Sequence, residues 1–162
     1  MNNLLGRLRR CKDDRGMMAN LRCVLVENKR HRAWPALNRL EVAIDDQVAA
    51  FVAGLYATHP EETSNGNFGV TCKAIEQKRG DKQGEDNKLT PTERRFQHLL
   101  AAGREEVLER VMRMVLIAKS QGIPVNYVQL ESDLGFWTER TKTEWAAAFW
   151  APGAEPIGEE AI

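Results

Sequence analysis

The stretch from Arg104 to Trp137 constrains the fold more than any other part of the sequence. Its first half repeats apolar residues at the i, i+3, i+4, i+7 spacing of one buried helical stripe: Val107, Leu108, Val111, Met114, Val115 and Ala118. Gly122 is placed to end this helix in a left-handed turn, and Pro124 prevents its continuation. A second apolar pattern follows at once, formed by Tyr127, Val128, Leu130, Leu134 and Trp137. The spacing therefore predicts two helices packed as a hairpin.

Further helices are expected on both sides of this hairpin. The sequence predicts them over 2–10, 13–28, 31–40, 45–57, 67–78, 90–103 and 138–150. The start at 90–93 (TPTE) is the strongest, because it combines a threonine cap, proline at the first helical position and glutamate at the third. No alternating strand pattern of any length is present in the sequence. Three of these segments, 2–10, 31–40 and 67–78, are short. The chain is predicted to be all-α, a bundle of about seven or eight helices in two lobes.

The segment 79–88 is the predicted boundary between the lobes. It has no apolar residue and two glycines, a composition typical of a mobile loop. We expect an N-terminal helical lobe over 1–80, a C-terminal helical lobe over 90–151 and an acidic tail over 152–162. In the N-terminal lobe, Trp34 and Leu37 are expected to anchor a short helix. Arg15, Arg22 and Lys29 recur every seven residues, which predicts that they line one side of the helix over 13–28.

The formal net charge is zero, but the charge is unevenly distributed. Residues 1–40 hold ten Lys/Arg against three Asp/Glu, whereas residues 41–162 hold thirteen against twenty. A basic segment on an otherwise acidic chain favours binding to a polyanion or to the acidic surface of a partner protein.

Little in the sequence points to catalysis or to a cofactor. It contains no phosphate-binding glycine loop and none of the common nucleophile motifs, and its three cysteines do not stand at metal-ligand spacings from its histidines. Cys72 and His98 are a conceivable thiol and base, but nothing in the sequence orients them. We therefore expect no catalytic residue, no metal and no cofactor. Since no signal peptide and no apolar run of ~20 residues is recognised, we expect a cytoplasmic protein without a membrane partner.

Two pairs of charged residues favour a self-neutralised surface. Arg110 and Arg113 stand four residues after Glu106 and Glu109, so that each arginine can form an i, i+4 ion pair on its own helix.

Arg94 and Arg95 have a different setting. They follow Glu93, which is expected to cap their helix, and they project from a first turn where the helix dipole disfavours positive charge. Such a placement indicates an external anion.

Tryptophan side chains can stack on nucleic-acid bases, but the four tryptophans of this chain fall in the helical repeat of apolar residues, which favours packing in the core: Trp34, Trp137, Trp145 and Trp150.

Five stretches together resemble the small, CasB-type subunit of the type I-E CRISPR surveillance complex, Cascade. They are RGMMANLRC, HRAWPALNRL, GNFGVTCKAI, LTPTERRFQHLLAAGREEVLERVMRMVLIAKSQGIPVNYVQLESDLGFW and EWAAAFW, in the family's order over most of residues 15–150. The resemblance implies an all-helical, non-catalytic subunit that binds nucleic acid without sequence specificity and stabilises the displaced DNA strand of the R-loop in antiviral defence.

The resemblance also implies which residues and partners are involved. Nucleic-acid contacts are expected at positions that match the family's basic motifs: Arg22, Lys73, Arg94, Arg95, Arg104, Arg113, Arg140 and Lys142. Expected partners are single-stranded DNA, the guide RNA–DNA hybrid, the large and backbone subunits of Cascade, and a second copy of the chain, with no small-molecule substrate. Two alternatives remain: a purely structural adaptor whose basic faces dock acidic protein surfaces, and a small hydrolase.

Overall fold

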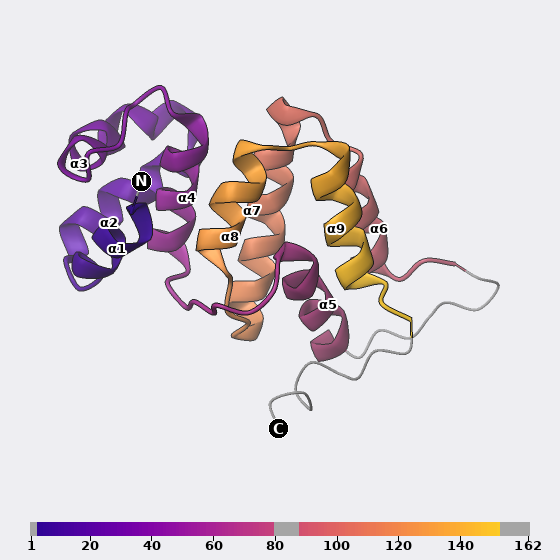
Figure 1. The fold of residues 1–162 in the computed structure, drawn as a ribbon. Helices are drawn as coiled ribbons and strands as arrows, with labels where there is room; N and C mark the ends of the chain where they lie inside the picture. The colour runs from indigo at the N-terminus through magenta and orange to yellow at the C-terminus, as the bar shows by residue number, and fades with distance from the viewer. Residues whose placement is uncertain (1–2, 80–87, 153–162) are drawn as a thin grey trace.

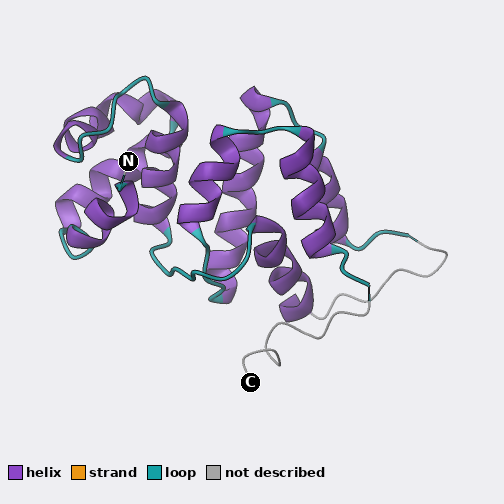
Figure 2. Cartoon of the chain, in the orientation of Figure 1, coloured by secondary structure: helices purple, strands orange, loops and turns teal. Residues whose placement is uncertain are grey.

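The computed structural model describes residues 3–79 and 88–152. Regular structure in these residues is helical, apart from one isolated β-bridge between Glu62 and Val125 (Figures 1 and 2). The α-helices are α1 (Leu4–Arg10), α2 (Arg15–Arg22), α3 (Trp34–Arg39), α4 (Gln47–Thr58), α5 (Phe68–Arg79), α6 (Pro91–Leu100), α7 (Arg104–Gln121), α8 (Tyr127–Gly135) and α9 (Glu139–Phe149). Two 3-10 helices, η1 (Cys23–Leu25) and η2 (Glu27–Ala33), follow α2. The predicted all-α class is confirmed, with nine α-helices in the described residues where seven or eight were expected.

Most helix ends follow the capping chemistry of the sequence. Asp14, Asp46 and Thr138 each accept a hydrogen bond from a backbone N–H in the first turn of the helix that follows. Gly122 ends α7 with φ of 68°, the left-handed conformation that glycine adopts without strain. After this turn α8 runs back antiparallel to α7, as the hairpin pattern predicts (Figure 1).

The second helix is shorter than its apolar pattern predicts. It ends at Arg22 instead of running to residue 28, and the chain continues through η1 into Val26, whose extended φ of −114° interrupts the helix. Arg30 donates from Nε to the Val24 carbonyl at 2.9 Å, which satisfies a backbone acceptor in the interrupted segment. Lys29 therefore lies on η2, and the prediction that it shares one helix face with Arg15 and Arg22 is wrong.

The helices form two groups (Figure 1). In the first, α4 is packed by α1 and α2, and α2 also contacts α3. In the second, α5 packs against α6, α7 and α9, although its residues fall within the predicted N-terminal lobe over 1–80. We therefore propose that the boundary between the lobes lies in residues 59–67. Most of the expected boundary loop (79–88) and of the expected acidic tail (152–162) lies in 80–87 and 153–162, outside the described residues.

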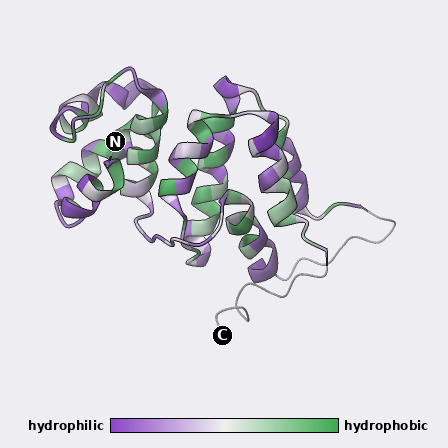
Figure 3. Ribbon diagram, viewed as in Figure 1, coloured by the Kyte–Doolittle hydropathy of each residue, from purple (hydrophilic) through white to green (hydrophobic). Residues whose placement is uncertain are grey.

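The core extends through both groups of helices. The hydropathy view shows α4 as a strongly apolar helix, and its residues 49–57 are all buried (Figure 3). Trp137 and Trp145 are buried as expected, whereas Trp34 and Trp150 are 47% and 38% exposed. The predicted anchoring role of Trp34 is therefore wrong. Val128, which belongs to the predicted apolar stripe of α8, is also exposed.

The segment joining the two groups of helices is fixed by buried hydrogen bonds. His59 Nε2 is 2.6 Å from the Ile123 carbonyl oxygen, and the Tyr127 hydroxyl donates to the His59 carbonyl at 2.6 Å. The Val125 N–H donates to the Glu61 carbonyl at 3.0 Å.

Among the described residues, no helix combines the length and the apolar character that spanning a membrane requires.

Candidate nucleic-acid interface

The start of α6 is built around a reciprocal cap. The Thr90 hydroxyl accepts from the Glu93 N–H at 3.1 Å, and the Glu93 carboxylate accepts from the Thr90 N–H at 2.9 Å. The same hydroxyl donates to a Glu76 carboxylate oxygen at 2.6 Å, which joins the cap to α5. The pKa of Glu93 is lowered, chiefly by the hydrogen bond from the Thr90 backbone, and the indole of Trp150 adds to the effect. The expected commitment of Glu93 to capping is thus observed.

Positive charge gathers around this cap. Residues 73–79 and 88–95 carry six cations, Lys73, Lys78, Arg79, Lys88, Arg94 and Arg95, against two carboxylates. Both carboxylates, Glu76 and Glu93, accept structural hydrogen bonds. Arg94 and Arg95 are exposed, and neither guanidinium forms an ion pair within the described residues. We name this surface, defined by those six cations, the α5–α6 basic end.

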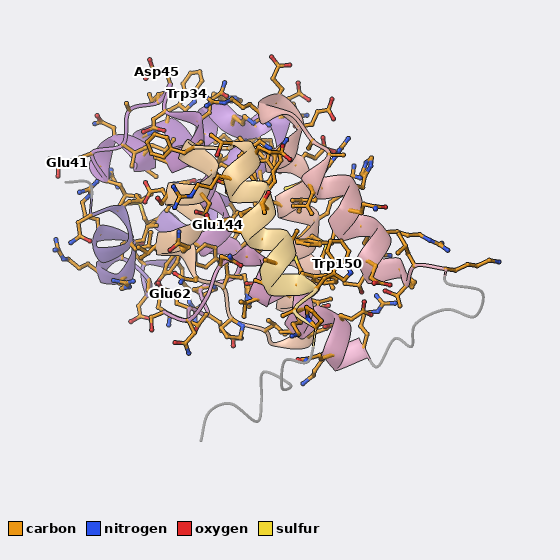
Figure 4. All side chains as sticks on the ribbon, turned by 45° about the vertical axis from the view of Figure 1, so that its right-hand side comes forward. Trp34, Glu41, Asp45, Glu62, Glu144 and Trp150 are labelled. Carbon is orange, nitrogen blue, oxygen red and sulfur yellow. The ribbon has the colours of Figure 1, made fainter. Side chains whose placement is uncertain are left out.

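Trp150 lies beside the α5–α6 basic end, where α9 has just ended (Figure 4). Its indole N–H donates to Glu93 at 2.9 Å, and its ring lies 5.3 Å from that of Phe96 and 4.8 Å from that of Phe149 between centroids. Lys78, Lys88 and the partly exposed Trp150 were not among the predicted site residues. Lys88 stands two residues before Thr90, and this proximity to the capping motif was the available signal, whereas Lys78 stands twelve residues before it.

Three more predicted residues lie near the opposite end of α6: Arg104, Arg140 and Lys142. Trp137 joins their two segments, because its indole N–H donates to the Ala102 carbonyl at 2.8 Å and Lys142 Nζ lies 5.5 Å from its ring centroid. Arg140 is 3.6 Å from Glu144 on the same helix. These residues lie in the first turns of α7 and α9, and the α6–α7 and α8–α9 connections that precede them lie at the same end of the bundle (Figure 1).

The remaining two predicted residues are engaged elsewhere. Arg113 forms its i, i+4 pair with Glu109 at 2.8 Å, and Arg110 pairs with Glu106 at 2.7 Å, so this face is self-neutralised. Arg22 Nε donates to the Ala57 carbonyl at 2.9 Å and joins α2 to the end of α4. The eight predicted residues therefore do not form one surface, and the α5–α6 basic end combines Lys73, Arg94 and Arg95.

The conceivable thiol–base pair is disfavoured by burial. Cys72 is fully buried in α5, and desolvation raises the pKa of its thiol well above the ordinary value, which disfavours the reactive thiolate. His98 is exposed on α6. Within the described ranges, no three His, Cys, Asp or Glu side chains are grouped closely enough to hold a metal ion.

An apolar groove lies between the first group of helices and α7. It has a volume of about 710 Å³, and its apolar lining includes Trp34, Leu37, Ile44 and Phe51 from the first group and Leu108 and Met112 from α7. Its charged lining consists of three glutamates and one arginine: Glu27, Glu105, Glu109 and Arg30. The carboxylates of Glu27 and Glu105 repel phosphates, so this groove differs in kind from the α5–α6 basic end.

Comparison with solved structures supports the fold. A Cse2-family CRISPR-associated protein from Thermus thermophilus matches with a TM-score of 0.73 and 20% identity, over 93% of this chain and 99% of that chain. A structure of CasB from Thermus thermophilus matches with a TM-score of 0.69 and 20% identity over the same shares, and CasB from M. ruber with 0.62 and 23% over 90% and 87%.

Comparison with known sequences gives the family. No curated protein sequence matches the chain. The family model described as CRISPR-associated protein Cse2 matches residues 5–150, which is most of the chain. The chain therefore belongs to the Cse2 family of CRISPR-associated proteins.

Proposed function

We propose that this protein is a non-catalytic subunit of the Cascade ribonucleoprotein, which acts in the cytoplasm in antiviral defence. In this role it binds nucleic acid without sequence specificity and stabilises the displaced DNA strand of the R-loop. The observation that carries the proposal is the pair Arg94 and Arg95 at the start of α6. Both are exposed, and the carboxylate beside them is occupied by the cap and by Trp150.

Electrostatics supports a phosphate ligand at this surface. The first turn of a helix carries partial positive charge. Two arginines placed there are therefore repelled by the positive end of the helix dipole and by each other. A bound phosphate removes both penalties and accepts hydrogen bonds from the guanidinium groups. Contacts of this kind hold the nucleic-acid backbone and carry no sequence information.

The Arg94→Ala/Arg95→Ala double variant tests the site. We expect weaker binding to single-stranded DNA of any sequence, with the slope of log affinity against log salt falling by roughly 0.7 per lost contact. Thermal stability is expected to change little, because exposed arginines contribute only ~0–1 kcal/mol through surface pairs. Filter binding at several salt concentrations and a melting curve measure both quantities.

The matched control is Arg10→Ala/Arg39→Ala, which removes the same charge from exposed positions on α1 and α3. We expect it to leave most of the binding and the slope in place. If both double variants weaken binding equally, the effect is one of net charge and the site at Arg94 and Arg95 is wrong. The purely structural alternative predicts unchanged binding in the first variant, with loss in subunit assembly instead.

The groove supports protein partners in addition to nucleic acid. We propose that it receives a segment of another Cascade subunit, large or backbone, that presents apolar side chains flanked by Lys or Arg. Its apolar lining and the carboxylates of Glu27 and Glu105 match such a segment, whereas the third carboxylate, Glu109, already pairs with Arg113. Co-purification with the other subunits tests this: Ile44→Asp is expected to reduce incorporation while leaving DNA binding by the isolated protein intact. Normal incorporation of Ile44→Asp would exclude the groove. Contacts with a second copy and with the guide RNA–DNA hybrid remain part of the proposal.

A further inference from the structure

We infer that Trp150 is a stacking platform for one base of the single strand whose phosphates lie on the α5–α6 basic end. This inference rests on the proposed function, because it requires nucleic acid at that surface. The inference adds a contact between the indole ring and a base to the phosphate contacts of the proposed function. The helical repeat of apolar residues had predicted that Trp150 packs in the core.

The indole of Trp150 is held in one orientation. Its N–H donates to a Glu93 carboxylate oxygen at 2.9 Å, and that carboxylate is itself fixed by the cap of α6. Phe149 meets the ring at an interplanar angle of 82° and Phe96 at 59°. These contacts fix the ring while 38% of the residue stays exposed. A ring oriented in advance loses little conformational freedom when a base stacks on it.

The cations lie where a strand stacked on Trp150 would pass. On α6, Arg94 follows Glu93 by about 100° around the helix axis, so it stands next to the carboxylate that holds the indole. On α5, Gly69 packs against the Trp145 carbonyl, and Glu76 reaches the cap of α6 through Thr90. Helix α5 therefore runs from the middle of α9 towards Trp150, and Lys73 lies between these two contacts.

Exposed tryptophans also occur in protein–protein interfaces. The charges around Trp150 favour a nucleic-acid partner over a protein partner. The carboxylates of residues 73–79 and 88–95 are both engaged in hydrogen bonds, whereas the cations Lys78, Lys88, Arg94 and Arg95 are exposed. Cations flanking an aromatic face are the arrangement by which proteins bind single strands without reading sequence. Trp34 has the opposite setting, because it lines a groove with three glutamates.

The test compares two ligands of equal charge, a ten-nucleotide oligothymidine and a ten-residue abasic DNA backbone. Wild-type protein is expected to bind oligothymidine more tightly. Trp150→Ala is expected to lose this preference through a ~5–10-fold fall in affinity for oligothymidine, near the lower end of the range for stacking on one face. Its affinity for the abasic strand and its salt slope are expected to stay unchanged, since no phosphate contact is removed.

Matched variants separate stacking from structural damage. Trp34→Ala removes a similarly exposed indole and is expected to keep the preference for bases. If Trp150→Ala fails to fold, two further variants replace it. Trp150→Leu retains apolar volume against Phe96 and is expected to lose the preference for oligothymidine over the abasic strand. Trp150→Phe retains an aromatic face and is expected to keep part of that preference. Retention of the full preference by folded Trp150→Ala or Trp150→Leu overturns the inference and leaves the phosphate site intact. If the wild-type protein binds neither ligand even at low salt, the proposed function itself fails.

Discussion

Glu93 serves three purposes in the start of α6. Its carboxylate accepts from the Thr90 N–H, it accepts from the Trp150 indole, and by doing so it is withdrawn from pairing with Arg94 and Arg95. The first role was evident from the TPTE motif, whereas the second depends on the end of α9, which lies 57 residues away in the chain.

The lowered pKa of Glu93 predicts a pH dependence of stability. A carboxyl whose pKa is lower in the folded state stabilises the fold above its unfolded-state pKa, and this stabilisation is lost as the pH falls through the folded-state value. For Glu93 that loss begins below about pH 4.5, its ordinary value. We expect the unfolding free energy of the wild type to fall more steeply on acidification than that of Glu93→Gln, which keeps an acceptor for the cap without titrating. Urea unfolding from neutral pH to below the ordinary pKa of Glu93 measures both, and parallel curves would contradict the assignment.

Helices α5 and α9 meet at a point where no side chain fits. A Cβ atom added at Gly69 would overlap the Trp145 carbonyl oxygen and lie 3.0 Å from the Asn67 side chain. The absence of a side chain therefore permits the close approach of the two helices, which is what brings α5 into the second group of helices.

Gly69→Ala is expected to destabilise the protein by ~1–3 kcal/mol, because the two backbones must separate to admit the new methyl group. The control is Gly135→Ala in α8, where nothing lies within 4 Å of an added Cβ. That change is expected to be neutral or to stabilise by up to ~1 kcal/mol, since alanine favours a helix more than glycine does. Denaturant unfolding of both variants checks this, and equal effects would show that the close approach at Gly69 is unimportant.

The two groups of helices are joined by contacts of different strength. Arg9 and Glu62 form a partly exposed ion pair at 2.9 Å, whereas the Tyr127 hydroxyl donates to the His59 carbonyl in the buried interior. Burial raises the pKa of Tyr127, so its hydroxyl remains a donor at any ordinary pH.

We expect Tyr127→Phe to cost ~1–2 kcal/mol of unfolding free energy, because the buried His59 carbonyl loses a hydrogen-bond donor. Arg9→Ala is expected to cost at most ~1 kcal/mol, since water replaces a partly exposed ion pair. Urea unfolding of the two variants gives the comparison. A larger loss for Arg9→Ala would indicate that the surface pair, and not the buried bond, holds the groups of helices together.

Features that depend on neighbouring residues could be predicted from the sequence. Helix class, the cap at Thr90, the left-handed turn at Gly122 and the pairing of Arg113 with Glu109 all act within a few residues along the chain. The family resemblance also followed from such local motifs, and the match to the Cse2 family model confirms it.

Which of these local features come together depends on contacts between residues that are distant in the chain. The tertiary structure placed α5 with the C-terminal helices, left Trp34 and Trp150 exposed at positions with core-like periodicity, and dispersed the eight predicted basic residues over separate surfaces. Periodicity marks the face of a helix that is apolar, but the burial of that face depends on what another helix, distant in the chain, places against it. For the same reason, the spacing of Lys73, Arg94 and Trp150 along the chain could not predict that they lie at one end of the molecule.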